Sequence, residues 1–522
     1  MPITAFLEKN AELYGNDVCL VERTPAEGTR REITWKQFND AANRFANLLI
    51  SFGVKKGDKV GILMTNCLEW LPIYFGTLKT GALAVPFNFR YTSEEIENCL
   101  RISDTSVLIY GSEFIERIDA IRPRLSLRKM IFVGSEKPEA TVPYAEADKM
   151  PATRPDVTIT DEDDGALYFT SGTTGFPKAI LHRHRALVSA CVTEQAHHSQ
   201  KKEDTFLCIP PLYHTGAIMH WFGSLLVGGK GVLMRGVKPK WIMEAISEEK
   251  ISIIWLLVPW AQDILDAIDS GEIDLAKYDL SRLRLMHIGA QPVPPSLVKR
   301  WLTRFPHHQY DTNYGLSESI GPGCIHLGVE NTHKVGAIGV PGYRWEAKIV
   351  GDDGTPVKQG QVGELAVKGD GVMKEYYKNP ESTAKSLKDG WLMTGDMAKQ
   401  DADGFIYLVD RKKDLIISGG ENIFPVQIED HIHKMDAVKD VAVIGIPDPR
   451  LGEVVLAIVE VKPGFTCTEA DVAAFCENLP RYKRPRRIIL ADVPRNPTGK
   501  IEKPLLRKLY SDANMIEKEM TK

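Results

Sequence analysis

Residues 58–88 read DKVGILMTNCLEWLPIYFGTLKTGALAVPFN, and their order of apolar and turn residues decides the fold. An apolar strand is followed by a helical segment that ends near Gly81, and a second apolar strand comes after it. Residues 106–134 repeat this order in SVLIYG, SEFIERIDAIRPRL and KMIFVG. Strands that alternate with helices indicate βαβ units and a parallel sheet covered on both faces. We therefore predict an α/β fold.

Three further regions follow along the chain. Residues 201–320 again alternate apolar strands with helical segments, and each strand ends in a turn rich in Pro, Gly or His. Residues 336–410 change to short strands with Gly-rich turns, which predicts a small β-rich subdomain. The remainder is typical of a compact α+β module. The sequence thus predicts an N-terminal domain of parallel α/β sheets over residues 1–410 and a C-terminal domain over 411–522, joined by a linker at 411–413.

The composition narrows the class of protein. The chain has 522 residues, 65 Lys and Arg against 69 Asp and Glu, and a formal charge of −4, so it has no positive field to hold nucleic acid. Hydrophobic residues make up 43%, too many for a largely disordered chain. The eight cysteines contain no CxxC pair, as expected for reduced thiols. With no secretory signal and no apolar stretch long enough for a transmembrane segment, we expect a cytoplasmic protein.

The most informative short stretch is YFTSGTTGFPK at residues 168–178. Four hydroxyl residues and two glycines occupy positions 170–175, and Lys178 closes the run. Such a loop can wrap phosphate oxygens with its N–H and O–H groups while the lysine adds charge. It differs from a Walker loop, in which Ser or Thr follows the lysine. The alternative is an ordinary polar surface loop.

Three other segments are candidate parts of a nucleotide site, and each has a simpler interpretation. Residues 311–318, DTNYGLSE, offer an aromatic face for a base and a carboxylate for Mg²⁺, or else a Tyr-Gly turn with a solvated glutamate. Asp396 and the Asp410–Arg411 pair follow strands, where a carboxylate can bind ribose hydroxyls, although Gly-Asp turns are common. Lys500, in NPTGK, is either a solvated charge or a group delivered by a second domain.

These segments stand in one order with PLYHTG at 211–216, GAQP at 289–292, DRKKD at 410–414 and GGENIFP at 419–425. In that order they resemble the adenylate-forming superfamily, which comprises acyl- and aryl-CoA ligases, firefly luciferases and the adenylation domains of non-ribosomal peptide synthetases. The resemblance covers nearly the whole chain, from ITWKQFNDAANRFANLL at 33–49 to Lys500.

The resemblance implies a role for each motif. The loop from Thr170 to Lys178 would clamp the β- and γ-phosphates of ATP, and Thr170 with Glu318 would serve Mg²⁺. Lys500 would bridge the substrate carboxylate and the α-phosphate while acyl-AMP forms and pyrophosphate leaves. The implied catalytic residues are Lys500, Glu318, Thr170 and His214. The implied cofactor-binding residues are Thr170, Ser171, Gly172, Thr173, Thr174, Gly175 and Lys178 for phosphate, Gly289, Ala290, Gln291, Pro292, Asp311, Tyr314, Gly315 and Ser317 around adenine, and Asp396 and Arg411 for ribose.

A second step is implied as well, in which a thiol attacks the acyl-AMP. The C-terminal domain would swing about a hinge at Lys413, withdraw Lys500 and bring in Gly419, Gly420 and Glu421 to line the thiol tunnel. Coenzyme A is the expected thiol, so ATP, Mg²⁺ and coenzyme A are the expected cofactors. A basic run would meet the phosphates of coenzyme A or else form a solvated face; it consists of Arg481, Lys483, Arg484, Arg486 and Arg487.

Residues 211–222 narrow the range of acids that we expect as substrate. Tyr213 and His214 stand where amino-acid-activating relatives place an aspartate, so we do not expect an α-amino acid. His214 is either a gate beside the substrate carboxylate or a histidine satisfied in the core. The apolar residues 217–222 predict a pocket for a hydrophobic acid, medium-chain or cyclic or aromatic, unless they belong to the core.

The combined expectation is an AMP-forming carboxylic acid–CoA ligase whose partners are small molecules. Three different functions compete with it: a ligase that loads a carrier protein, a luciferase-like enzyme, and a non-catalytic binder of nucleotide or acyl ligands. The complete set of motifs argues against the binder. The sequence leaves open whether the protein forms a homodimer and in which direction the ligase reaction runs.

Overall fold

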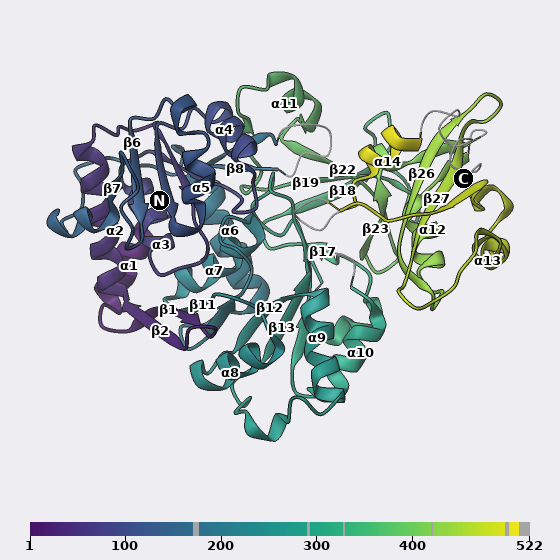
Figure 1. Cartoon of the computed structure of the whole chain (residues 1–522), viewed down its shortest axis with the longest axis horizontal. Coiled ribbons are helices and arrows are strands. Elements are labelled where there is room, and N and C mark those ends of the chain that lie inside the picture. The colour runs from purple at the N-terminus through teal and green to yellow at the C-terminus, as the bar shows by residue number, and fades with distance from the viewer. Residues whose placement is uncertain (171–176, 290–292, 327–328, 419–420, 496–500, 511–522) are drawn as a thin grey trace. The chain divides into compact units, whose positions relative to one another are not determined.

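The computed structural model describes residues 1–522 except 171–176, 290–292, 327–328, 419–420, 496–500 and 511–522, which are grey in Figure 1, and the side chains of 329–330. Its contacts divide the chain into two compact units. Unit 1 comprises residues 1–170, 176–347 and 366–393, and unit 2 comprises residues 171–175, 348–365 and 394–522. Each unit has a hydrophobic core of its own.

The first sheet of unit 1 has the strand order β20-β9-β8-β4-β3-β5-β6-β7. Strands β8 to β7 in that order pair in parallel, and β9 is antiparallel to both of its neighbours. Helix α3 (Trp70–Lys79) connects β3 to β4, which confirms the βαβ unit predicted in residues 58–88. The strands are β3 (Lys59–Leu63), β4 (Leu83–Pro86), β5 (Val107–Gly111), β6 (Lys129–Val133), β7 (Val142–Pro143), β8 (Asp164–Phe169), β9 (Ala179–Arg183) and β20 (Glu375–Tyr376).

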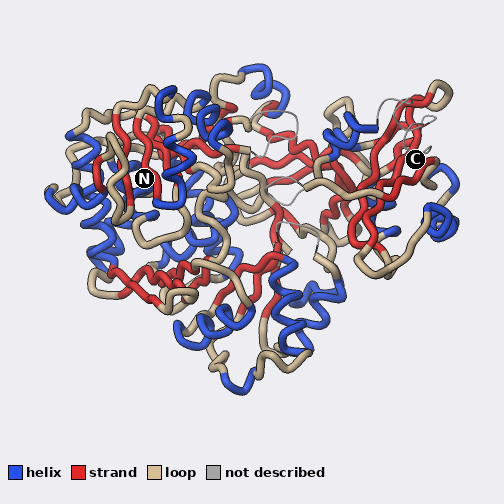
Figure 2. The backbone as a smooth tube through the Cα atoms, in the orientation of Figure 1, coloured by secondary structure: helices blue, strands red, loops and turns tan. Residues whose placement is uncertain are grey.

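The second sheet of unit 1 has the order β14-β13-β12-β10-β11-β1-β2 and is parallel apart from the hairpin of β1 and β2. Its strands run side by side in red in Figure 2. The register sets Trp255, His287 and Asp311 in one row across β12, β13 and β14. The strands are β1 (Val18–Thr24), β2 (Thr29–Thr34), β10 (Thr205–Cys208), β11 (Lys230–Met234), β12 (Ile253–Leu257), β13 (Leu285–Gly289) and β14 (Gln309–Asp311).

Four helices, α2 (Trp35–Ser51), α3, α6 (His184–His198) and α7 (Thr215–Val227), share one core with strands of both sheets. The ring of Phe75 in α3 lies 5.6 Å from that of Phe38 in α2 and 5.9 Å from that of Trp221 in α7. Helices α3 and α7 are apolar on nearly every side, as is typical of a helix buried between layers. The other helices of unit 1 are α1 (Thr4–Leu13), α4 (Ser93–Ile102), α5 (Ile115–Asp119), α8 (Pro239–Glu249), α9 (Val258–Asp269), α10 (Pro295–Arg304) and α11 (Pro380–Ser386).

Short strands complete unit 1, and a β-rich segment opens unit 2. Strands β15 (Asn313–Tyr314), β16 (Cys324–Ile325) and β17 (Val340–Pro341) form a small antiparallel sheet. A further sheet has the order β18-β19-β22-β21, with β23 on β22, and the boundary between the units falls within β18, β19 and β22. Its strands are β18 (Glu346–Val350), β19 (Gly363–Lys368), β21 (Leu387–Lys388), β22 (Trp391–Gln400) and β23 (Ile406–Arg411). Short strands thus occur where the sequence predicts them, and a separate subdomain over residues 336–410 stays a prediction.

The C-terminal part of unit 2 is the predicted α+β module. Its sheet has the order β25-β24-β27-β26, with β28 beside β27. The elements are β24 (Ile416–Ser418), β25 (Glu421–Ile423), α12 (Pro425–Ile432), β26 (Val438–Asp448), β27 (Gly452–Val461), α13 (Glu469–Phe475), β28 (Arg487–Leu490) and α14 (Lys503–Tyr510). We predict a domain boundary at residue 410 and a movement of the C-terminal domain about a hinge at Lys413. Both stay predictions.

Two composition-based expectations can be compared with the fold. All eight cysteines lie in described residues; all are free thiols, and all but Cys467 are buried. Among the helices that the structure describes, none has both the length and the apolar character that crossing a bilayer demands.

Candidate active site

The two ends of the predicted phosphate loop are held together at the neck of a β-hairpin. Thr170 follows β8 and Lys178 precedes β9. The amide of Thr170 donates to the carbonyl oxygen of Lys178 at 3.0 Å, and the amide of Lys178 donates to Oγ1 of Thr170 at 3.3 Å. The neck thus fixes where the loop leaves the sheet. Five predicted ligands in the loop lie outside the described residues: Ser171, Gly172, Thr173, Thr174 and Gly175.

Tyr376 connects the lysine of this loop to the predicted magnesium ligand. The Nζ atom of Lys178 lies over the Tyr376 ring, 4.8 Å from its centroid. The Tyr376 hydroxyl donates to Oε1 of Glu318 at 2.8 Å. Burial, together with the charge of Glu318, raises the pKa of Tyr376, so its hydroxyl stays protonated and donates. The structure therefore brings Lys178 and Glu318 to one place, on either side of Tyr376.

Sequence reasoning missed Tyr376. Its segment, VMKEYYKN, carries no motif, and its position follows from the pairing of β20 with β9, which sets Tyr376 opposite Ile180. That pairing joins residues almost two hundred positions apart. A tyrosine in a short strand-like segment was the one available signal, and it does not specify a partner strand.

The segment 314–318 is anchored to two elements of unit 1. Nε2 of His182, on β9, donates to the carbonyl oxygen of Ser317 at 2.8 Å, and the hydroxyl of Thr215 at the start of α7 donates to Oγ of Ser317 at 3.4 Å. Burial lowers the pKa of His182 to about 4, so it is neutral. Tyr314 lies in β15 and is buried, whereas Gly315 is exposed. The turn is thereby fixed between β9 and α7.

His214 lies at the N-terminus of α7 and is exposed. Its Nδ1 accepts a hydrogen bond from the amide of Gly216 at 3.3 Å, so it caps the helix. The interpretation of His214 as a core histidine does not fit this position. The gate interpretation stays a prediction.

The apolar residues after His214 belong to the core rather than to a pocket. Trp221 packs against Phe38 and Phe75, and Phe222 faces Tyr74 at 6.5 Å between ring centroids. Their size therefore says nothing about the acid. His220 of α7 faces the second sheet as well, and its ring lies 4.7 Å from that of Trp255.

Two predicted adenine-site residues end strands of the second sheet. Gly289 ends β13 and Asp311 ends β14, while Ala290, Gln291 and Pro292 lie outside the described residues. The Asp311 carboxylate is buried and lies 2.9 Å from Nε2 of His197. Burial alone lowers the pKa of His197, but the Asp311 charge raises it above the ordinary value, so the two form an ion pair. The Asp311 side chain is thus turned toward α6 and committed to His197.

In unit 2, the predicted ribose residues form an ion pair across two strands. Asp396 on β22 stands opposite Arg411 on β23, and Nε of Arg411 lies 2.6 Å from Oδ1 of Asp396. Asp396 is buried, and its amide donates to Oγ1 of Thr394 at 3.1 Å. The arginine thus orients the Asp396 carboxylate, and the ribose role of the two residues stays a prediction.

The remaining predicted residues of unit 2 lie near its middle and its end. Lys413 lies in the one-turn helix Lys412–Asp414 between β23 and β24, and Glu421 opens β25 and is exposed. Gly419, Gly420 and Lys500 lie outside the described residues. The roles of these residues stay proposals.

Two successive parts of the chain match family models of known proteins. The family model of AMP-binding enzymes matches residues 7–377, and that of the AMP-binding enzyme C-terminal domain matches residues 427–500. The long-chain-fatty-acid–CoA ligase FadD13 of Mycobacterium tuberculosis is 34% identical over 483 residues, 92% of this chain and 93% of that protein. The anthranilate CoA ligase AuaEII in complex with anthranoyl-AMP superposes with a TM-score of 0.83 at 28% identity, over 97% of each chain.

A third relative was solved with the nucleotide itself. ATP-bound MatB from Rhodopseudomonas palustris superposes with a TM-score of 0.84 at 25% identity, over 98% of this chain and 99% of that one. The matched motifs, the fold and the two family models agree. The chain is an enzyme that belongs to the AMP-binding family, the adenylate-forming superfamily, and its relatives there are acid–CoA ligases.

Proposed function

We propose that this enzyme is an AMP-forming carboxylic acid–CoA ligase for a hydrophobic acid. In the first half-reaction a carboxylate oxygen of the acid attacks the α-phosphorus of ATP, and pyrophosphate leaves. In the second, the sulfur of coenzyme A attacks the acyl carbon, AMP leaves with the electrons of the broken C–O bond, and the thiol proton is released. The observation that carries the proposal is the contact of Lys178 with Tyr376 and of Tyr376 with Glu318, beside the phosphate loop.

The first half-reaction brings two anions together, and its transition state spreads charge over the phosphoryl oxygens. Lys178 and the donors of the loop would hold the β- and γ-phosphates. Glu318 and Thr170 offer oxygen ligands, the kind that Mg²⁺ prefers, and the partly exposed Glu318 carboxylate fits that ion. Bound Mg²⁺ would neutralise phosphate charge. Tyr376 would orient the Glu318 carboxylate toward it.

Unit 2 would supply the remaining groups. The oriented Asp396 carboxylate would accept the ribose hydroxyls, and Lys500 would bridge the acid and the α-phosphate. In the second half-reaction Lys413 would act as the hinge, and Gly419, Gly420 and Glu421 would line the path of the thiol. Coenzyme A as the acceptor is supported by the names of FadD13 and AuaEII, which are both CoA ligases.

The acid is proposed to be medium-chain, cyclic or aromatic. The name of FadD13 gives a long-chain fatty acid, and the name of AuaEII gives the aromatic acid anthranilate. These two names support an aliphatic or an aromatic acid. The acid is proposed to lie at the start of α7, where Gly216 adjoins the Trp255 ring: a Cβ atom built on Gly216 would lie 3.0 Å from Cη2 of Trp255.

A panel of acids tests the proposal. Linear acids from C2 to C16, benzoate and cyclohexane carboxylate are incubated with ATP and Mg²⁺, and pyrophosphate and coenzyme A-dependent AMP are measured. We expect acid-dependent pyrophosphate release, and AMP formation that requires coenzyme A. Absence of acid-dependent pyrophosphate release would show a non-catalytic binder. Light emission would identify a luciferase-like enzyme, and transfer only to a carrier protein would identify a carrier-loading ligase.

A further inference from the structure

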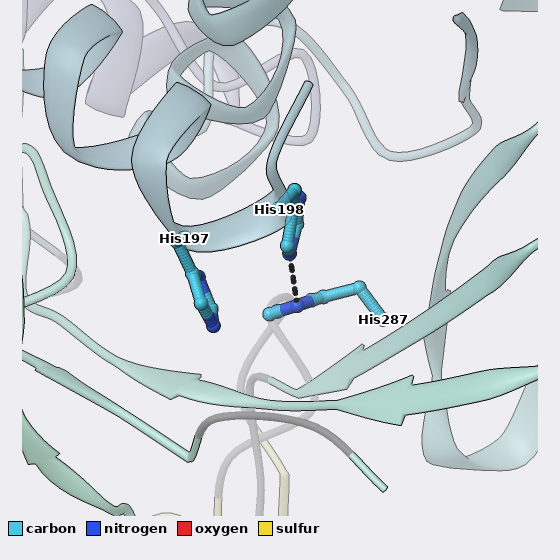
Figure 3. Close-up of side chains that lie close together, drawn as sticks. All are labelled: His197, His198 and His287. Carbon is cyan, nitrogen blue, oxygen red and sulfur yellow. Dashed lines mark hydrogen bonds between the residues drawn. The ribbon is translucent and has the colours of Figure 1, made fainter. Parts of the chain in front are cut away.

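Between the end of α6 and strand β13, unit 1 contains a buried chain of side chains in close polar contact. Glu194 and His198 come from the last turns of α6, and His287 comes from β13. Nδ1 of His198 lies 2.7 Å from Oε1 of Glu194, and Nε2 of His198 lies 2.9 Å from Nδ1 of His287. Figure 3 shows His198 and His287 joined by this bond, with His197 beside them. All three members of the chain are at most 2% exposed.

The distances favour protons over a metal ion between these groups. Tetrahedral zinc with nitrogen ligands at its usual bond length separates those ligands by about 3.3 Å. The contacts of Glu194 with His198 and with Nδ1 of His220 are 2.7 and 2.6 Å, and the His198–His287 contact is 2.9 Å. These are hydrogen-bond lengths, in which each close pair shares one proton.

The carboxylate at one end fixes the proton positions along the chain. Burial lowers the pKa of His198 and of His287, so both imidazoles are neutral and each carries one proton. The Glu194 carboxylate, 2.7 Å from Nδ1 of His198, favours the tautomer with the proton on Nδ1, which leaves Nε2 bare to accept from Nδ1 of His287. Nε2 of His287 is therefore also bare. The chain of side chains therefore ends at Nε2 of His287, which carries no proton and can only accept a hydrogen bond.

This acceptor lies beside the space left by the missing Cβ atom of Gly289, a residue that the sequence predicts in the adenine site. A Cβ atom built on Gly289 would lie 3.7 Å from Oγ1 of Thr312, 3.8 Å from Nε2 of His287 and 3.9 Å from Nε1 of Trp255. Among the described residues, neither Nε2 of His287 nor the N–H of Trp255 has a hydrogen-bond partner, although both are buried. A buried donor and a buried acceptor left open together cost free energy unless a polar group joins them.

The indole of Trp255 connects this space to the start of α7. A Cβ atom on Gly216 would lie 3.0 Å from Cη2 of Trp255 and 3.5 Å from Nδ1 of His214. The benzene edge of the indole thus faces the proposed position of the acid's carboxylate, and its N–H faces Gly289. An acyl group lying along the indole would reach the open donor and acceptor with its distal part.

We propose that the acid activated by this enzyme carries a hydroxyl group, bound beside Gly289 by His287 and Trp255. The hydroxyl donates to Nε2 of His287 and accepts from the N–H of Trp255, which no other simple substituent does as well. A ketone oxygen would set its lone pairs against the bare Nε2. A second carboxylate would do so with a full charge. This specificity rests on the proposed ligase function.

Matched pairs of acids test it in the full-length enzyme. Cyclohexane carboxylate is compared with its 3- and 4-hydroxy derivatives, and benzoate with 3- and 4-hydroxybenzoate, by acid-dependent pyrophosphate release. We expect at least one hydroxy acid to exceed its parent by about tenfold or more in kcat/KM, the value of one well-made hydrogen bond. Equal rates for every pair would overturn the hydroxyl proposal alone, whereas no release with any acid would overturn the ligase function.

Two variants probe the site itself. Trp255→Phe removes the N–H and keeps an aromatic ring, and Gly289→Ala places a methyl group where the hydroxyl would bind without contacting any described atom closer than 3.7 Å. Each should lower the ratio of hydroxy-acid to parent-acid kcat/KM toward one, mainly through KM. Trp221→Phe, in the core beside Phe38, is the matched control and should keep the ratio.

Two further outcomes would overturn the hydroxyl proposal. A ratio unchanged in both site variants would mean that the space holds a buried water, and the proposal would be wrong. Stoichiometric zinc in the purified protein, measured by elemental analysis, would overturn it as well, because a metal would occupy the imidazole lone pairs. Thermal melting of each variant checks that it is folded, so that the kcat/KM values of folded proteins are compared.

Discussion

The Tyr376 hydroxyl donates a hydrogen bond of 2.8 Å to Oε1 of Glu318, 58 residues earlier in the chain. The same ring lies under the ammonium group of Lys178. One side chain therefore sets the relative position of the cation proposed to bind phosphate and the carboxylate proposed to bind Mg²⁺.

Tyr376→Phe should leave the ring under Lys178 and remove only the hydrogen bond to Glu318. We expect kcat for pyrophosphate release to fall about tenfold, the value of one charge-assisted hydrogen bond, and more Mg²⁺ to be needed for half-maximal rate. Initial rates at several Mg²⁺ concentrations measure both effects. Tyr377→Phe is the control, because it removes a tyrosine hydroxyl that donates to Asp104 at 2.8 Å. Equal losses in the two variants would refute the role of Tyr376.

Lys500→Ala should slow acyl-AMP formation by about a hundredfold or more, since a cation that stabilises transition-state charge is lost. Thioester formation from supplied acyl-AMP should be largely spared. Single-turnover measurements of the two half-reactions separate these effects. Lys508→Ala, on the exposed side of α14, is the control. If both half-reactions fell equally, the assignment of Lys500 to the first would be wrong.

Lys413→Pro should have the reverse effect. Proline fixes φ at one value, so a change of backbone conformation at residue 413 is blocked. We expect near-normal adenylation and thioester synthesis reduced by about tenfold or more, provided that the second step needs that change. Lys413→Ala keeps the backbone free and serves as the control. Normal thioester synthesis in the proline variant would eliminate residue 413 as the hinge.

Acid should destabilise unit 1 through buried neutral histidines. Burial lowers the pKa of His184 to about 4, and neither ring nitrogen has a hydrogen-bond partner among the described residues. The unfolded chain takes up this proton near the ordinary histidine pKa and the folded one does not, so stability is lost as the pH falls from about 6.5 toward 4.

His184→Leu should remove one such proton from the unfolded state. Between pH 7 and pH 5 the variant should lose about 2 kcal/mol less stability than the wild type. Urea unfolding of the full chain at the two pH values measures the difference. His307→Leu, at an exposed imidazole, is the control. A pH dependence that is the same in His184→Leu and the wild type would contradict the assignment.

The alternation of strands and helices could be predicted because it depends on local patterns. The βαβ unit of residues 58–88 and the strands that end near Cys208 and Gly289 are visible as apolar runs bounded by turns. The side-chain partners could not be predicted in the same way. Tyr376 meets Glu318 through a strand pairing between distant segments, and Asp311 meets His197 through the register of β14 and the end of α6.

The apolar run after His214 shows the same limit. Its composition suits a pocket or a core equally, and the direction of each side chain on α7 decides between them. Trp221 turns toward Phe38 and Phe75, whereas His220, one residue earlier, turns toward Trp255. Neighbours on a helix point about 100° apart, so the residues of a single run pack against different parts of the core.

Ser317 accepts hydrogen bonds from His182 on β9 and from Thr215 at the start of α7. One residue therefore belongs at once to the proposed nucleotide turn and to the helix end proposed to meet the acid. A displacement of either contact on filling one subsite changes the energy of the other. Occupancy of the two subsites is then thermodynamically linked, and the factor by which ATP changes the affinity for the acid must equal the factor by which the acid changes the affinity for ATP.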